Sequence, residues 1–245
     1  MKVGIVAAMK EEITPLMERF RDRDGWSIGD FIQFSGRIFD MEVGAVLCGI
    51  GKVNAAVGTT LLIQRFKPDY LINIGVAGGF SKRLALGDIV ISSLVRHHDA
   101  DATSFAYEFG QIPLMPAAFK SDERLVSLAE SVSLSDMQGH IHTGEILSGD
   151  SFITTPEQID VITRRFPNAM AVEMEGAAVA QTSYLFRVPF VLIRSISDNV
   201  HEAGNPGIYA KRMQMSAENS VQLILAMLKN MKGAGDYEKN SEFRY

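Results

Sequence analysis

The chain alternates short apolar runs with stretches in which apolar residues recur three and four positions apart, as at Ile13, Leu16 and Met17. The apolar runs predict strands, and the helical spacing predicts helices with one buried face. We expect strands at 3–9, 31–35, 41–48, 70–75, 89–95, 144–148, 169–173 and 190–196. We expect one helix from about residue 13, two helices at 53–66 and 125–134, one that begins after residue 155, one that ends at about 186 and one that ends near 232. Because strands and helices alternate, the pattern predicts one α/β domain with helices on both faces of a central sheet.

Local signals predict where several elements begin and end. Thr14 is expected to cap the first helix, with Pro15 in its first turn, and Thr155 precedes Pro156 in the same way. The glycine-rich segment 75–79 is expected to be a turn after a strand. Residues 99–119 show no period and predict a long loop, which in a compact domain is often functional.

Composition narrows the class of protein. Of 245 residues, 47% are hydrophobic and 22% are charged, a balance typical of a globular domain. The polar, glycine-containing tail at 233–245 is expected to be disordered, which leaves a domain at 1–232. The net charge is −5 without a basic block, so nucleic-acid binding and membrane binding are not expected. The single cysteine, Cys48, cannot form an internal disulfide, which favours the reducing cytoplasm.

Acidic residues follow three of the predicted strands. The first strand leads to Glu12, the strand at 169–173 leads to Glu175, and the strand at 190–196 leads to Asp198 with Arg194 nearby. One such acid is equally well explained by the helix dipole, which favours acids at helix N-termini. Ligands of α/β sheets bind beyond the carboxyl ends of strands, however. Three acids and an arginine in this position therefore indicate a shared site.

Other motifs carry less weight. Residues 49–51 begin a dinucleotide fingerprint, but Asn54 stands where its third glycine belongs. The histidines and acids at 97–101, and those at 140–142, lack the spacing of a metal site and are interpreted as solvated loop residues. Residues 148–151 are not a serine-hydrolase elbow, and there is no Walker loop. We therefore expect neither a metal ion nor a cofactor.

Six blocks of sequence occur in the order of one known family. They are GIVAAM (4–9) followed by Glu11 and Glu12, CGIGKVNAA (48–56), HDADAT (98–103), SGDSFI (148–153), AVEME (171–175) and RSISD (194–198). With them the chain resembles bacterial 5'-methylthioadenosine/S-adenosylhomocysteine nucleosidases of the nucleoside phosphorylase superfamily, over about residues 1–200 and more loosely in the last helix. The resemblance implies a single-domain three-layer α/β/α sandwich with a central mixed sheet, a homodimer and a nucleoside substrate.

The resemblance also implies a role for each acid. Glu12 would activate water as a base, Glu175 would bind the ribose hydroxyls, and Asp198 would protonate adenine at N7. Further substrate-binding positions are Ile50 at the 5' group, Phe152 and Ile153 at the purine, Met174 at the ribose, Ser197 beside the acid, Glu173 and Arg194 at the water, Val76, Ala77 and Gly78, and Tyr209 in a lid. Phe105, Tyr107 and Pro113 match residues that this family contributes across a dimer interface. Val76 departs from the family, which usually has a serine there to help position the water.

The predicted reaction is hydrolysis of the N-glycosidic bond of 5'-methylthioadenosine and S-adenosylhomocysteine, a step of methionine salvage. A carboxylate at Glu12 suits water activation and would repel phosphate, which favours hydrolysis over phosphorolysis. Three alternatives stay open: a futalosine or aminofutalosine hydrolase, a purine nucleoside phosphorylase, and a purine-binding protein without catalytic activity.

Overall fold

The computed structural model describes residues 1–132, 139–201 and 206–233, and over 206–214 and 232–233 it describes the backbone alone. The strands are β1 (Lys2–Ala7), β2 (Arg21–Ile28), β3 (Phe31–Ile38), β4 (Met41–Leu47), β5 (Tyr70–Gly79), β6 (Ile89–His97), β7 (Phe119–Lys120), β8 (Ile141–Ser148), β9 (Ala169–Glu173) and β10 (Phe190–Asn199). The helices are α1 (Lys10–Met17), α2 (Lys52–Phe66), the short 3-10 turn η1 (Thr103–Phe105), α3 (Glu123–Glu130), α4 (Pro156–Arg165), α5 (Gly176–Phe186) and α6 (Pro206–Gly233).

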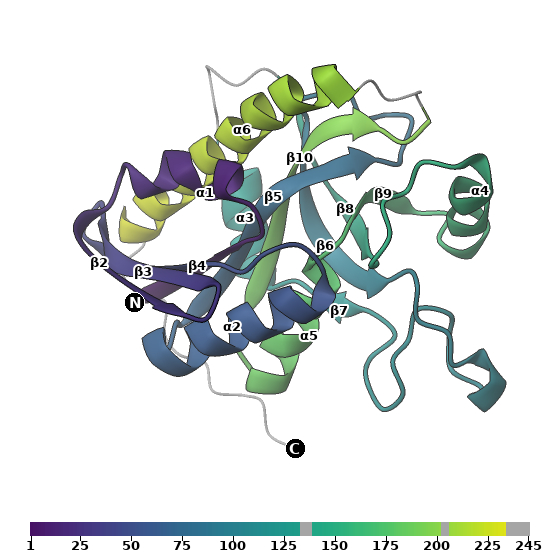
Figure 1. The fold of residues 1–245 in the computed structure, drawn as a ribbon, viewed down its shortest axis with the longest axis horizontal. Helices are drawn as coiled ribbons and strands as arrows, with labels where there is room; N and C mark the ends of the chain where they lie inside the picture. Colours follow the sequence, from purple (N-terminus) through teal and green to yellow (C-terminus); the bar gives the residue numbers. More distant parts are fainter. Residues whose placement is uncertain (133–138, 202–205, 234–245) are drawn as a thin grey trace.

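These strands form one mixed sheet, and helices cover both of its faces (Figure 1). α1, α3 and α6 pack on one face, and α2 and α5 pack on the other. Successive side chains of a strand point to opposite faces. On β1, Ile5 accordingly belongs to the core under α1 and α6, and Val6 belongs to the core under α2 and α5. The predicted three-layer α/β/α sandwich with a mixed sheet is confirmed.

The sheet closes on itself beside β5. This strand pairs in parallel with β1 and β10, and its last residues, Gly78 and Gly79, pair antiparallel with β9. The order β10-β6-β8-β9-β5 therefore forms a ring, because β10 and β5 are also neighbours. β1, β4, β3 and β2 extend from β5 as an open wing. The ring brings the end of β9 next to the ends of β5 and β10.

Three strands differ from the sequence prediction, and one of them is the short β7, which lies at the end of the predicted loop at 99–119. The pattern does not predict β2, because its side chains are almost all exposed and show no apolar alternation. The prediction of a turn at 75–79 is wrong, since β5 continues to Gly79 and pairs there with both β9 and β10. Glycine provides space at this point: a Cβ on Gly79 would lie 3.0 Å from Cγ2 of Ile196.

The first helix begins earlier than predicted. Met9 is its N-cap, Thr14 bonds to the carbonyl of Lys10 one turn back, and Pro15 lies inside the helix, so the expected cap at Thr14 is wrong. The reason is Glu12, whose carboxylate accepts hydrogen bonds from the backbone at the helix start. At α4 the prediction is confirmed, because Thr155 caps the helix.

The last helix ends at Gly233, close to the predicted end near 232. Beyond this glycine, the predicted disordered tail lies outside the described residues. Among the residues that the structure describes, no helix is long and apolar enough to cross a membrane.

Candidate active site

A cavity opens where β1, β5, β9 and β10 end. It is lined by Ala8, Met9, Glu12, Ile50, Val76, Ala77, Gly78, Ser151, Phe152, Ile153, Val172, Glu173, Met174, Glu175, Ser197, Asp198 and Val200. The structure thus brings Glu12, Glu175 and Asp198 into one cavity from three separate segments of the chain. Five lining residues carry no signal in the sequence, because their apolar or small side chains resemble those of the core: Ala8, Met9, Ser151, Val172 and Val200.

Glu12 lies in the first turn of α1, with only 4% of its surface exposed. Its Oε2 accepts hydrogen bonds from the backbone of Ala8 (3.0 Å) and Met9 (2.9 Å), and its Oε1 accepts one from the backbone of Val76 (3.1 Å). Burial raises the pKa of Glu12, although Arg194 and these backbone donors oppose the shift. A carboxylate with a raised pKa is a stronger base once it is ionised.

Two neighbours on β5 keep Glu12 in place. A Cβ on Gly75 would lie 2.7 Å from Oε1 of Glu12, so a larger residue there would displace the carboxylate. The Val76 contact uses the backbone N–H, so it does not depend on which side chain stands at this position. The departure from the family at Val76 therefore leaves the support of Glu12 intact.

Glu175 is the N-cap residue of α5 and lines the cavity. Its Oε1 accepts a hydrogen bond from the backbone of Gly51 at 2.7 Å. Burial, followed by the charge of Glu173, raises the pKa of Glu175 to about 8. The cavity therefore holds a carboxyl group that binds a proton far above its usual range.

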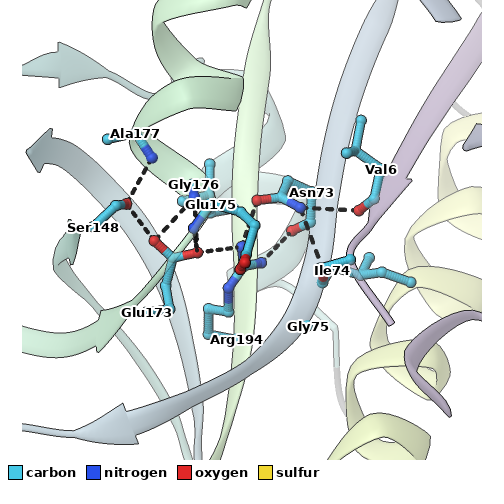
Figure 2. A network of polar contacts seen from close by, with 12 residues as sticks. Val6, Asn73, Ile74, Gly75, Ser148, Glu173, Glu175, Gly176, Ala177 and Arg194 are labelled. Atoms are coloured by element: carbon cyan, nitrogen blue, oxygen red, sulfur yellow. Dashed lines mark hydrogen bonds and ion pairs between the residues drawn. The ribbon is translucent and has the colours of Figure 1, made fainter. Parts of the chain in front are cut away.

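Glu173, which lines the cavity, forms an ion pair with Arg194, with 2.8 Å between Oε2 and Nη2 (Figure 2). The same carboxylate accepts hydrogen bonds from the backbone of Glu175 and Gly176, at the start of α5, and from the hydroxyl of Ser148. Arg194 is 1% exposed and is not among the residues that line the cavity. Arg194 was predicted to line the cavity on the side of the water. In the structure it lies behind the acids instead, and it acts on them through its charge.

Asp198 and Ser197 lie at a β-bulge in β10. The pairing with β5 shifts register between Ile196 and Asp198, so these two consecutive residues both line the cavity. The Ser197 hydroxyl donates a hydrogen bond to Oδ1 of Asp198 at 2.8 Å. This contact orients the Asp198 carboxylate, which is the role that the resemblance implies for Ser197.

Charged side chains join three segments beside the cavity, namely the start of α2 and the loops that contain Asp99 and Asp150. Asp99 accepts from Nζ of Lys52 (2.5 Å) and from the backbone of Asp150 (2.9 Å), and Oδ1 of Asp150 accepts from the backbone of Lys52 (2.8 Å). These contacts fix the segments that carry Ile50 and Phe152 into the cavity.

The prediction that the histidines at 97 and 98 are solvated loop residues is wrong. His97 and His98 are buried, because β6 continues to His97 and the ring of His98 packs against Gly149. The described residues contain no cluster of three or more side chains that could hold a metal ion.

Three of the predicted substrate contacts lie outside this cavity, and a fourth falls on a residue whose side chain is not described. Phe105, Tyr107 and Pro113 belong to the long loop between β6 and β7, and Phe105 is 79% exposed. The side chain of Tyr209, predicted as a lid residue, lies outside the described part of the chain.

Comparison with known proteins shows the family to which the chain belongs. Residues 2–229 match the family model of the phosphorylase superfamily. Over 231 residues, the chain is 56% identical to a 5'-methylthioadenosine/S-adenosylhomocysteine nucleosidase of Maridesulfovibrio salexigens, covering 94% of this chain and 100% of the relative. The chain belongs to the 5'-methylthioadenosine/S-adenosylhomocysteine nucleosidase family.

Solved structures agree with this nucleosidase family. A nucleosidase of this name from Colwellia psychrerythraea, in complex with adenine, has a TM-score of 0.88 and 43% identity, with 94% of this chain and 95% of that chain covered. The futalosine hydrolase of Helicobacter pylori has a TM-score of 0.86 and 32% identity, with coverage of 94% and 98%. The fold is thus shared by 5'-methylthioadenosine/S-adenosylhomocysteine nucleosidases and by a futalosine hydrolase.

The raised pKa of Glu175 predicts a pH dependence of stability. Folding shifts this pKa from 4.5 to about 8, so the folded state holds the proton more tightly, and stability falls as the pH rises between these values. Urea unfolding at about pH 5 and about pH 8.5 should show that Glu175→Gln gains stability relative to the parent protein as the pH rises, by more than about 1 kcal/mol. The exposed Glu157→Gln is the control and should leave the pH dependence unchanged. An equal pH dependence in the parent and Glu175→Gln would contradict the prediction.

Proposed function

We propose that the protein hydrolyses the N-glycosidic bond of 5'-methylthioadenosine and S-adenosylhomocysteine, releasing adenine and the 5'-thio-substituted ribose. The observation that carries this proposal is the convergence of Glu12, Glu175 and Asp198 on one cavity, in a chain that belongs to this nucleosidase family. No step of this reaction requires a metal ion or a cofactor, because the three acids supply the proton transfers and the charge.

Glu12 is proposed as the base that activates water. Its burial raises its pKa, and three backbone N–H groups hold its oxygens in place. Cleavage of an N-glycosidic bond develops positive charge on the ribose, which nearby carboxylates stabilise. The ionised form of Glu12 and the carboxylate of Glu173, which both line the cavity, therefore suit a cationic transition state.

Asp198 is proposed as the acid that protonates the adenine leaving group at N7. Ser197 orients its carboxylate, and Phe152, which lines the same cavity with 55% of its surface exposed, would stack on the purine. Glu175 would bind the ribose hydroxyls beside the backbone of Met174, and the Ile153 backbone would contact the purine edge.

The charge of the cavity supports hydrolysis over phosphorolysis. Phosphate would have to enter beside Glu12, whose ionised form, the one that acts as a base, repels an anion. The nearest arginine, Arg194, is already bound to Glu173 and lies behind the cavity wall. Water carries no charge and meets no such barrier.

A homodimer is proposed to complete the 5' end of the cavity. On the long loop, Phe105 and Leu114 are 79% and 86% exposed, and beside the mouth Ile50 and Val53 are 54% and 73% exposed. Exposed apolar side chains of this size support a partner surface. The partner's loop would then contribute Phe105, Tyr107 and Pro113 to the thioether pocket.

The cysteine of the chain bears on its location in the cell. Cys48 is buried and forms no disulfide, which supports a place in the reducing cytoplasm.

The substrate is tested by adenine release in the presence and absence of phosphate. We expect turnover of 5'-methylthioadenosine and S-adenosylhomocysteine that is independent of phosphate. Turnover that requires phosphate would identify a phosphorylase. Futalosine is the comparison substrate, because a futalosine hydrolase shares the fold; a preference for it would overturn the proposed specificity, and binding without turnover would indicate a purine-binding protein.

The roles of two acids are tested by isosteric amides. Asp198→Asn and Glu12→Gln remove the proton donor and the base, so each should lower kcat by about 100-fold or more. Glu11→Gln, an exposed neighbour on α1, is the matched control and should keep normal turnover. Circular dichroism shows whether each variant is folded. Near-normal turnover in either amide variant would remove that residue from its proposed role.

The shared pocket is tested by Phe105→Ser with light scattering and steady-state kinetics. We expect a dimer in the parent protein, and a raised KM for 5'-methylthioadenosine in the variant because an apolar contact to the 5' group is lost. Val161→Ser, another exposed apolar position, should leave KM unchanged. A fully active monomer would refute the shared pocket.

A further inference from the structure

Asn73 lies on β5 in the polar network of Glu173 and Arg194, between Arg194 and Val6 (Figure 2). It is 1% exposed and is not among the residues that line the cavity. Its side-chain oxygen accepts a hydrogen bond from Nη2 of Arg194, and its backbone oxygen accepts one from Nη1 at 3.0 Å. One residue therefore holds both terminal nitrogens of this guanidinium.

The chemistry of the contacts fixes the orientation of the Asn73 amide. Arginine has no acceptor, so the amide oxygen must face Arg194. The amide nitrogen accordingly faces two acceptors, the backbone oxygens of Val6 at 2.9 Å and Ile74 at 3.4 Å. Val6 lies on β1, just before the backbone N–H groups that bind Glu12. The Asn73 side chain thus joins β1 and β10 from the strand between them.

We propose that Asn73 is a positioning residue, which holds Arg194 beside Glu173 so that the arginine charge acts on Glu12 from a fixed place. This inference rests on the proposed function, in which Glu12 activates water. Arg194 needs such an anchor because a long side chain has many rotamers. It also bonds to Glu173, but that carboxylate holds only Nη2.

The position of Arg194 matters because its charge lowers the pKa of both Glu12 and Glu175 against the effect of burial. If the guanidinium moved away, both acids would hold their protons to higher pH, and less Glu12 would be ionised at neutral pH. Aspartate at position 73 would supply the same acceptor, but its charge would offset that of Arg194 and would face the oxygens of Val6 and Ile74 without a donor. Asparagine supplies the acceptor without the charge.

Asn73→Ala and Asn73→Asp test this inference by kcat and KM for 5'-methylthioadenosine between about pH 5 and about pH 9. In Asn73→Ala we expect kcat to fall by up to about 100-fold while KM changes less than about threefold, since the misplaced group lies outside the binding surface. The acid limb of the kcat/KM profile should move to higher pH. Asn73→Asp keeps the acceptor, so it should recover part of kcat while its acid limb stays shifted. Gln33→Ala, another buried amide on the sheet, is the control and should move neither quantity.

Several outcomes separate positioning from a structural role. A folded Asn73→Ala with the parent's kcat and acid limb would overturn the inference, and so would a loss of kcat without a shift of the acid limb. If Asn73→Ala does not fold, Asn73→Leu, which has a similar volume and no acceptor, is measured in its place, and the parent's kcat and acid limb in this variant would overturn the inference.

The activity of the parent protein keeps this test apart from that of the proposed function. If the parent releases no adenine, the proposed function fails, and the inference is tested without substrate by urea unfolding. With Arg194 displaced, stability should fall more steeply with rising pH in Asn73→Ala than in the parent. An unchanged pH dependence would overturn the inference.

Discussion

Glu173 and Arg194 form an ion pair that is almost fully buried between β9 and β10. Burying two charges costs free energy unless further hydrogen bonds satisfy them, and removing one partner of such a pair typically costs about 3–5 kcal/mol. Here the backbone at the start of α5 and Ser148 satisfy Glu173, and Asn73 satisfies Arg194. The pair therefore fixes the start of α5, and with it Glu175, relative to the strands that carry the other acids.

Closure of the sheet makes this pair possible. β9 reaches β5 only at Gly78 and Gly79, where small residues allow the strands and the bulge of β10 to approach. The acids then face one cavity even though β9 runs antiparallel to β5. A simple open parallel sheet would place its acids along one edge, whereas the ring of strands places them around the cavity.

The cavity combines strong burial with few positive charges, and its chemistry follows from that imbalance. Burial raises the pKa of Glu12 and Glu175, and Arg194 limits both shifts. A group of buried carboxylates destabilises the ionised folded protein, and such perturbed groups cluster at functional sites. The same negative field that costs stability disfavours phosphate and favours a ribosyl cation.

The amino-acid sequence by itself determined the order of strands and helices, the three-layer architecture and the acids at the strand ends, because hydrophobic period and local residue order carry that information. It also carried the family resemblance. It did not reveal the exposed strand β2, which lacks apolar alternation, or the start of α1, which depends on the contacts of the Glu12 carboxylate.

Only the tertiary structure decided that β5 continues through Gly79, that Arg194 lies behind the cavity and that Asn73 holds it. The last contact joins residues 121 positions apart. The pKa of each acid likewise depends on burial and on charges from distant segments. These properties arise from pairing between strands far apart in the chain, which no local pattern of residues specifies.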